Sequence, residues 1–269
     1  MFLKKYVKAY IKKHRKIRVL ESFPAEQDPS IVYRIIDEKT PLVPSRNLRR
    51  ISFWAGGCSY NYSSVYLSKM HKIQPICGYA QRAARAFFET YGKPERALVL
   101  GSAGCAVPRF LALSYKKCEI KGIEYSDLMI QIARKYFIGG PVFRNFELIK
   151  GDAYAYVREA AESFNFIFVD LFDSGKISEG MFSPGFLSDI GRLSTTESIV
   201  IFNPLSVSLE DSAGFIRSLP IPVNRAYLFG RGDRFFIALV KTARPELLPA
   251  FEKRLLKQAD IFDSYTPAG

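Results

Sequence analysis

The feature that most constrains the fold of this chain is an apolar segment that ends in a glycine-containing turn. Residues 97–100 read ALVL, and Gly101, Ser102, Ala103 and Gly104 follow before a second apolar stretch. Glycine allows backbone angles that a side chain forbids, and it lets a ligand approach the chain closely. We therefore predict that Gly101, Ser102 and Gly104 bind a nucleotide-type ligand, with a tight strand–helix turn as the alternative.

Acidic residues end the three apolar runs that follow this turn. The run GIEYSD contains Glu124, KGDAYAY contains Asp152, and FIFVDLFD contains Asp170 and Asp173. In a doubly wound parallel sheet the carboxyl ends of the strands line one crevice, and ligands bind there. The pattern predicts a single small-molecule site that combines one glycine turn with four carboxylates.

Two of these acids have the spacing of nucleotide contacts. Glu124 lies about 20 residues after the turn, where an acid commonly accepts hydrogen bonds from ribose hydroxyls. The alternative is a solvated acid at a strand end. Asp152 is predicted, with Ala153 beside it, to contact an adenine amino group. An aspartate before a helix is equally a favoured N-cap, and both interpretations stay open.

The pair Asp170 and Asp173 is predicted to carry the chemistry. The strand before Asp170 is almost wholly apolar, so its carboxyl would emerge from a dry core with a raised pKa. Together with Phe172 and Tyr79, the two acids would cradle an amine. One acid would neutralise the amine while the other removes a proton from the attacking nitrogen. The alternative is a strand-end acid and a loop cap.

The chain divides into three predicted parts: a basic amphipathic helix over residues 1–20, a small β-rich unit over 21–78, and a Rossmann-like α/β domain over 79–269. In the last part, helices alternate with strands, and two strands around GRGD form a closing antiparallel hairpin. This order is typical of a methyltransferase-type sheet. Residues 246–262 are predicted to form one surface helix.

The net charge of +13 is concentrated at the start of the chain. The first twenty residues hold eight Lys or Arg and no acid. We favour a helix docked on the domain; contact with nucleic acid or with an anionic membrane is the alternative. No signal peptide is expected, four unpaired cysteines suggest a cytoplasmic protein, and two histidines make a metal site improbable.

On these motifs the chain resembles the spermidine synthase family of aminopropyltransferases from about residue 79 to 240. The residues that carry the resemblance are Tyr79, VLGSAG, IEYSD with IARKYF, IKGDAYAY, FIFVDLFD and MFSPGF. The resemblance implies that Glu124 holds ribose and Asp152 holds adenine, while Asp170, Asp173 and Tyr79 hold and activate the attacking amine. It further implies S-adenosylmethionine or its decarboxylated form as co-substrate, a small N-terminal β domain, and a possible homodimer.

Two positions depart from that family. Its glycine turn reads GGGDGG, and the aspartate both meets the amine of decarboxylated S-adenosylmethionine and repels the carboxylate of the intact form. Here the position is Gly104. A charge pair at about 4 Å is worth roughly 4 kcal/mol at an effective dielectric near 20, so intact S-adenosylmethionine is expected to be a competent donor. Gln81 stands where the family often has an acid, so the predicted acceptor subsite at Gln81 does not favour a diamine.

Three functions follow, in order of preference. The first is transfer of an aminopropyl or 3-amino-3-carboxypropyl chain to an amine or other nucleophile, with release of methylthioadenosine. The second is methyl transfer on the same fold, and the third is a non-catalytic nucleotide-binding module. The basic surface suggests an acceptor larger or more anionic than putrescine, such as a small molecule, modified peptide or nucleotide. The arginines that could line the site are Arg46, Arg49, Arg50, Arg82 and Arg85.

Overall fold

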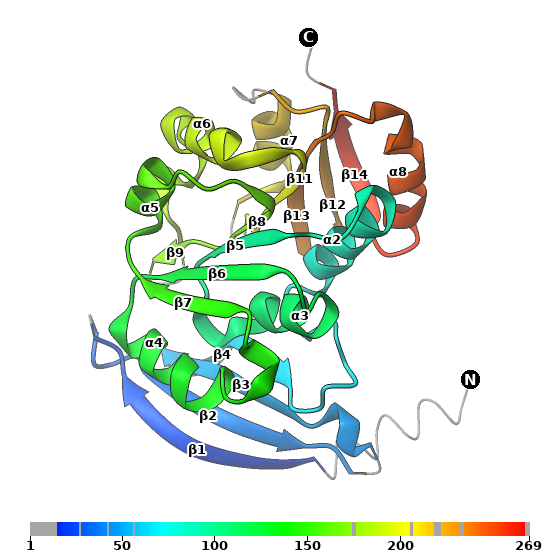
Figure 1. The fold of residues 1–269 in the computed structure, drawn as a ribbon. Coiled ribbons are helices and arrows are strands. Elements are labelled where there is room, and N and C mark those ends of the chain that lie inside the picture. The colour runs from blue at the N-terminus through cyan, green and yellow to red at the C-terminus, as the bar shows by residue number, and fades with distance from the viewer. Residues whose placement is uncertain are drawn as a thin grey trace.

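The computed structural model describes residues 15–26, 28–41, 43–55, 57–173, 176–204, 207–217, 222–231 and 234–266. They form a small antiparallel sheet and a large mixed sheet covered by helices on both faces (Figure 1). Among these residues, no helix is both long and apolar enough to cross a membrane. The predicted α/β class is therefore confirmed.

The small sheet contains four strands in the order β1-β2-β3-β4. Their bounds are β1 Lys16–Pro24, β2 Val32–Lys39, β3 Leu48–Ala55 and β4 Cys58–Tyr66. Every neighbouring pair is antiparallel. This sheet is the β-rich unit that the sequence predicts.

Strand β1 corrects the end of the predicted basic helix. Residues 16–19 pair with β2, because the β-branched Ile17 and Val19 suit an extended strand that can hydrogen-bond to its neighbour. Residues 1–14, which carry most of that prediction, lie outside the described residues.

The large sheet has eight strands in the order β14-β12-β13-β11-β8-β5-β6-β7. Its parallel strands are β5 Arg96–Leu100, β6 Glu119–Glu124, β7 Phe146–Lys150, β8 Phe164–Val169 and β11 Ser194–Phe202. Strands β12 Arg225–Arg231 and β13 Arg234–Lys241 form the predicted closing hairpin. Strand β8 is central and apolar, as expected for a parallel strand that is buried on both faces.

Helices cover both faces of the large sheet (Figure 1). Residues of α2 Gly78–Tyr91, α3 Ala106–Ser114, α4 Asp127–Ile132 and α8 Leu248–Leu256 belong to one hydrophobic core cluster. Residues of α5 Ala153–Glu159, α6 Pro184–Leu193 and α7 Leu209–Arg217 belong to the other. After β5, β6 and β7, the chain leaves the carboxyl end of the strand and enters a helix that covers the sheet.

The predicted helix over residues 246–262 is wrong at its end. Helix α8 stops at Leu256, and β14 Asp260–Tyr265 pairs with β12 as the outer strand of the sheet. The side chains of β14 alternate between exposed and half-buried, which is the period of a strand. Pairing with a distant strand therefore overrides the local helical pattern.

Polar contacts fix the small sheet to the large domain. Arg49 on β3 donates to the Asp37 carboxylate at 2.6 Å and to the carbonyl oxygen of Tyr136 at 2.9 Å. The Glu26 carboxylate accepts from the backbone N–H of Leu128 at 3.0 Å and from the Ser126 hydroxyl at 3.2 Å. The small sheet therefore packs against the segment that follows β6.

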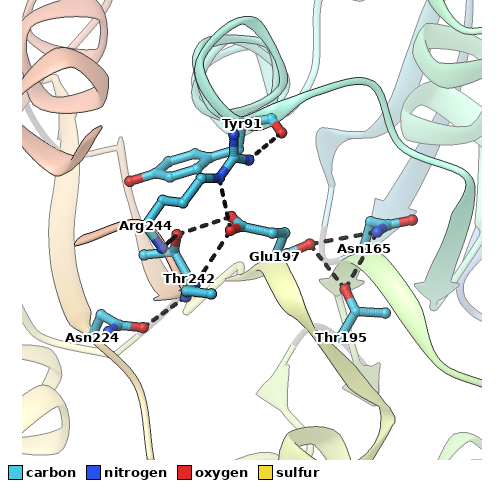
Figure 2. A network of polar contacts seen from close by, with 8 residues as sticks. Tyr91, Asn165, Thr195, Glu197, Asn224, Thr242 and Arg244 are labelled. Atoms are coloured by element: carbon cyan, nitrogen blue, oxygen red, sulfur yellow. Dashed lines mark hydrogen bonds and ion pairs between the residues drawn. The ribbon is translucent and has the colours of Figure 1, made fainter. Parts of the chain in front are cut away.

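A second polar network lies at the opposite, amino end of the central strands. Glu197 on β11 accepts from the Thr242 hydroxyl at 2.9 Å and from Arg244 Nε at 3.0 Å, and Arg244 also donates to the Tyr91 carbonyl at 2.7 Å (Figure 2). These contacts link α2, β11 and the segment after β13. The predicted site acids Glu124, Asp152 and Asp170 lie at the carboxyl ends of the parallel strands. The Glu197 network is therefore separate from them.

Candidate active site at the carboxyl ends of the strands

The glycine turn packs directly against the backbone of Asp170. Gly101 and Gly104 have φ angles of +81° and +66°. A Cβ on Gly101 would lie 2.2 Å from the Asp170 carbonyl oxygen, so a side chain cannot be accommodated there. Both residues occupy the left-handed region that favours glycine. The predicted nucleotide turn and the predicted catalytic acid Asp170 are therefore in contact.

Ser102 has a structural role that the sequence does not indicate. Its side chain is buried, and its hydroxyl donates to the Val99 carbonyl at 3.1 Å. The hydroxyl also lies 2.4 Å from the Cβ that a residue at Gly122 would carry. The Ser102 hydroxyl is therefore engaged within the protein, and the predicted contact of Ser102 with a cofactor stays a prediction.

Glu124 is the last residue of β6, and its carboxylate contacts the backbone of the glycine turn. Its two carboxylate oxygens accept from the backbone N–H groups of Ala103 at 3.0 Å and Ser126 at 3.1 Å. Burial raises the pKa of Glu124, and these backbone hydrogen bonds oppose the rise. A carboxylate offers about four lone-pair directions, so it can accept two further hydrogen bonds from a ligand.

Asp152 lies at the end of β7 and caps helix α5. Its carboxylate accepts from the Tyr154 backbone N–H at 2.9 Å, which is the N-cap contact. The side chain is exposed, and Ala153 beside it is buried. The contact of this pair with adenine stays a prediction.

Asp170 follows β8 and is largely buried. Its carboxylate accepts from Asn203 Nδ2 at 2.8 Å, and Asn203 follows the neighbouring strand β11. The pKa of Asp170 is raised to about 7: burial is the largest cause, the hydrogen bond from Asn203 opposes the rise, and the charge of Glu124 adds to it. A carboxyl with this pKa can take up a proton near neutral pH, as a general base must.

The Asn203 hydrogen bond gives a testable pH dependence. The bond favours the ionised carboxylate, so Asn203→Ala is expected to raise the Asp170 pKa. If the reaction needs the ionised form, the rising limb of the kcat/KM profile near pH 7 moves to higher pH, by about one unit. Rates measured from pH 5 to 9 check this. A limb that stays in place would mean that another group controls it.

Cys77 is the N-cap of α2, and Tyr79 lies in the first turn of this helix. Cys77 has a left-handed φ of 53°, and its thiol pKa is raised by burial and by the Asp170 charge, which places it near that acid. The Arg82 guanidinium lies 5.6 Å from the Tyr79 ring centroid. Phe172 and Asp173 form β9 and pair with β10 Lys176–Ile177. The Asp173 side chain lies outside what the structure describes.

The Gln81 side chain is hydrogen-bonded within the protein. The side chain is fully buried; its oxygen accepts from the Gln74 N–H and its nitrogen donates to the Ile76 carbonyl, both at 2.7 Å. The amide therefore holds the segment before α2 in place. The contact of Gln81 with an acceptor stays a prediction, and its observed partners are backbone groups of an irregular segment, which no sequence motif indicates.

Most of the arginines that were expected at the site have acidic partners. Arg49 pairs with Asp37, Arg50 with Glu38 and Arg85 with Glu89, at 2.6, 2.9 and 2.8 Å. Their charges are therefore largely balanced within the protein. This weakens the expectation of an anionic acceptor.

Gly104 is packed against Ser63 of the small sheet. A Cβ on Gly104 would lie 2.2 Å from the Ser63 hydroxyl oxygen and 2.4 Å from its Cβ. Ser63 is buried. In the family that the chain resembles, an aspartate stands at the position of Gly104. Here the neutral Ser63 side chain from β4 occupies the space that such a side chain would need.

Three residues near the predicted site were not identified from the sequence: Asn203, Ser63 and Tyr62. Asn203 contacts Asp170, Ser63 contacts Gly104, and Tyr62 precedes Ser63 in β4. Asn203 could have been found, because it follows the apolar run SIVIF as Asp170 follows its own strand. Ser63 and Tyr62 come from β4, whose sequence carries no motif that links it to the glycine turn.

Comparisons with known proteins agree with the resemblance. The chain is 31% identical over 119 residues to a polyamine aminopropyltransferase of Vibrio vulnificus; the match covers 43% of this chain and 40% of that protein. The match thus spans about two fifths of the curated relative. No protein-family model matches the chain.

Solved structures show the fold. A probable spermidine synthase from Corynebacterium glutamicum has a TM-score of 0.67 and 16% identity, covering 91% of each chain. Human methyltransferase-like protein 13, solved in complex with SAH, has a TM-score of 0.50 and 21% identity, covering 72% of this chain and 95% of that one. The fold is therefore that of spermidine synthases and Rossmann-like methyltransferases.

Proposed function

We propose that this protein transfers a three-carbon chain from S-adenosylmethionine, or from its decarboxylated form, to an amine, and releases methylthioadenosine. The observation that carries the proposal is the position of Asp170. It is a largely buried carboxyl with a pKa of about 7, it packs against the glycine turn, and it lies near Glu124. The similarity to an aminopropyltransferase supports the same reaction.

Donor binding would use the turn and the two strand-end acids beside it. The backbone at Gly101 and Gly104 leaves room for close approach, Glu124 would accept from the ribose hydroxyls, and Asp152 would accept from the adenine amino group. These roles place the adenosyl group along the ends of β5, β6 and β7.

Acceptor activation would use Asp170, with Tyr79 and Asp173 beside it. The amine nitrogen attacks the chain carbon next to sulfur; the C–N bond forms as the C–S bond breaks, and sulfur keeps the bonding electron pair. The nitrogen loses a proton to the Asp170 carboxylate. Positioning of the amine in line with the C–S bond supplies the rest of the rate enhancement.

We further infer that intact S-adenosylmethionine is a competent donor, so that the chain would be 3-amino-3-carboxypropyl. Gly104 and Ser63 provide no anion at the turn that would repel a donor carboxylate. Of the two nearby acids, Glu124 would face the ribose, and Asp170 would face the end of the transferred three-carbon chain that is bonded to sulfur.

Methyl transfer is the second candidate, favoured by the same neutral turn and by the methyltransferase-like sheet. Contact of the basic N-terminal segment with nucleic acid or membrane, assembly as a homodimer, and a cytoplasmic location stay predictions. So does a small-molecule acceptor, which the aminopropyltransferase similarity favours.

The nucleoside product distinguishes the candidates. The protein is incubated with each donor and a set of primary amines, and the products are identified by mass spectrometry. Methylthioadenosine supports chain transfer, and S-adenosylhomocysteine supports methyl transfer. Absence of both products, with the donor bound, supports a non-catalytic module.

A further inference from the structure

Strand β4 carries a bulge at Tyr62, opposite β3. Asn61 pairs with Ser52 and Ser63 pairs with Ile51, so Tyr62 is the extra residue between them. Bulges re-aim a side chain and are over-represented next to active sites. Because Ser63 packs against Gly104, the bulge lies beside the glycine turn.

Tyr62 belongs to a group of rings that we call the aromatic wall: Tyr33, Phe53, Tyr60 and Tyr62. The ring centroid of Tyr62 lies 5.7 Å from that of Tyr33 and 6.3 Å from that of Phe53, while Phe53 and Tyr60 stack at 4.9 Å. Tyr60 is 48% exposed, so the wall reaches solvent at one end. Strands β2, β3 and β4 therefore contribute one continuous aromatic surface.

Within the aromatic wall, Tyr62 directly precedes Ser63, which packs against Gly104 of the glycine turn. Burial is the main cause that raises the pKa of Tyr62, and the charges of Glu124 and Asp170 add to the rise. Burial and Glu124 likewise raise the pKa of Tyr33. The contact of the neighbouring Ser63 with Gly104, together with the influence of both acids, indicates that Tyr62 lies on the side of the small sheet that meets the candidate site.

This part of the site combines negative charge with aromatic rings. Among the residues that the structure describes, no lysine or arginine forms an ion pair with Glu124 or Asp170. Aromatic faces attract a cation that lies within about 6 Å of the ring centroid. Acids and rings together suit a cationic ligand.

We propose that the aromatic wall is the subsite for the sulfonium centre of the donor, with the face of Tyr62 against the positively charged sulfur. The inference rests on the proposed function and deepens it. Between ribose and the attacking amine, the donor atom that carries positive charge is the sulfur. Transfer leaves that sulfur as a neutral thioether, so the attraction disappears on reaction and the subsite favours donor over product.

Paired titrations test this subsite without measuring activity. S-Adenosylmethionine and methylthioadenosine are titrated calorimetrically into wild type, Tyr62→Phe and Tyr62→Ala. Tyr62→Ala is expected to weaken the sulfonium ligand about tenfold and the thioether less than about twofold. Tyr62→Phe keeps the ring and is the matched control; it should bind both ligands within about twofold of wild type.

Equal weakening of both ligands by Tyr62→Ala, or no weakening, would overturn the subsite while leaving the proposed function intact. If wild type binds neither ligand, the proposed function fails and the subsite with it. Thermal melting checks that the variants fold. Tyr62→Leu keeps apolar volume without an aromatic face, and it replaces the alanine variant if that one does not fold.

Discussion

Asp170→Asn is expected to lower turnover by about a hundred- to ten-thousand-fold, with donor affinity within about threefold of wild type. The substitution removes the group that accepts the amine proton. The amide oxygen can still accept the hydrogen bond from Asn203, so the local structure is preserved. Turnover and calorimetric donor binding are measured on the same preparation. The matched control is Asp189→Asn, a change in α6 that should leave both quantities unchanged.

The same variant has a predicted effect on stability. The pKa of Asp170 rises from 3.8 to about 7 in the folded protein, so the fold holds the proton more tightly than the unfolded chain does. The free energy of unfolding of wild type therefore falls as the pH rises from about 4 to 7. At about 1.4 kcal/mol per unit, Asp170→Asn is expected to be more stable above pH 7 by up to about 4 kcal/mol.

Equal losses of donor binding and turnover, with a lower melting temperature at pH 8, would contradict this account. They would show that Asp170 holds the end of β8 in place rather than accepting a proton.

Gly104→Asp is expected to destabilise the protein by about 3 kcal/mol or more. The residue has a positive φ, which costs a non-glycine residue about 1–2 kcal/mol. In addition, the new side chain would overlap Ser63, whose oxygen lies 2.2 Å from the Cβ position. Urea unfolding measures the loss. Gly140→Asp is the matched control, because its φ is +82° and no atom lies within 4 Å of its Cβ position.

The double variant Ser63→Gly with Gly104→Asp separates these two causes. Removal of the serine side chain is expected to recover the part of the loss that comes from overlap, so the two changes are not additive. The double variant should also favour decarboxylated S-adenosylmethionine over the intact form by about tenfold or more, because it places a carboxylate at the turn. Strict additivity, or an unchanged donor preference, would refute the role assigned to the Gly104–Ser63 contact.

Local patterns were enough to predict the central sheet and its strand-end acids. Three of the parallel strands, β6, β7 and β8, end in or are closely followed by an acid, so Glu124, Asp152 and Asp170 could be placed from nearby residues alone. Burial of β8 likewise explains the predicted rise in the Asp170 pKa.

Features that depend on distant contacts could not be predicted in this way. Ser63 meets Gly104 only because β4 docks on the glycine turn. Gln81 was assigned to the acceptor from its place in a motif, whereas its amide binds the backbone of the preceding segment. Residues 260–265 become a strand because β12 offers a free edge, which the helical pattern of their own sequence does not reveal.

The central claim is that the strand ends bind an adenosyl sulfonium donor beside a turn that carries no anion. Calorimetric titration of wild type with intact and decarboxylated S-adenosylmethionine, at one pH and salt concentration, tests it most directly. The account predicts that the intact donor binds at least as tightly as the decarboxylated one. Clearly tighter binding of the decarboxylated donor, or no binding of either, would contradict it.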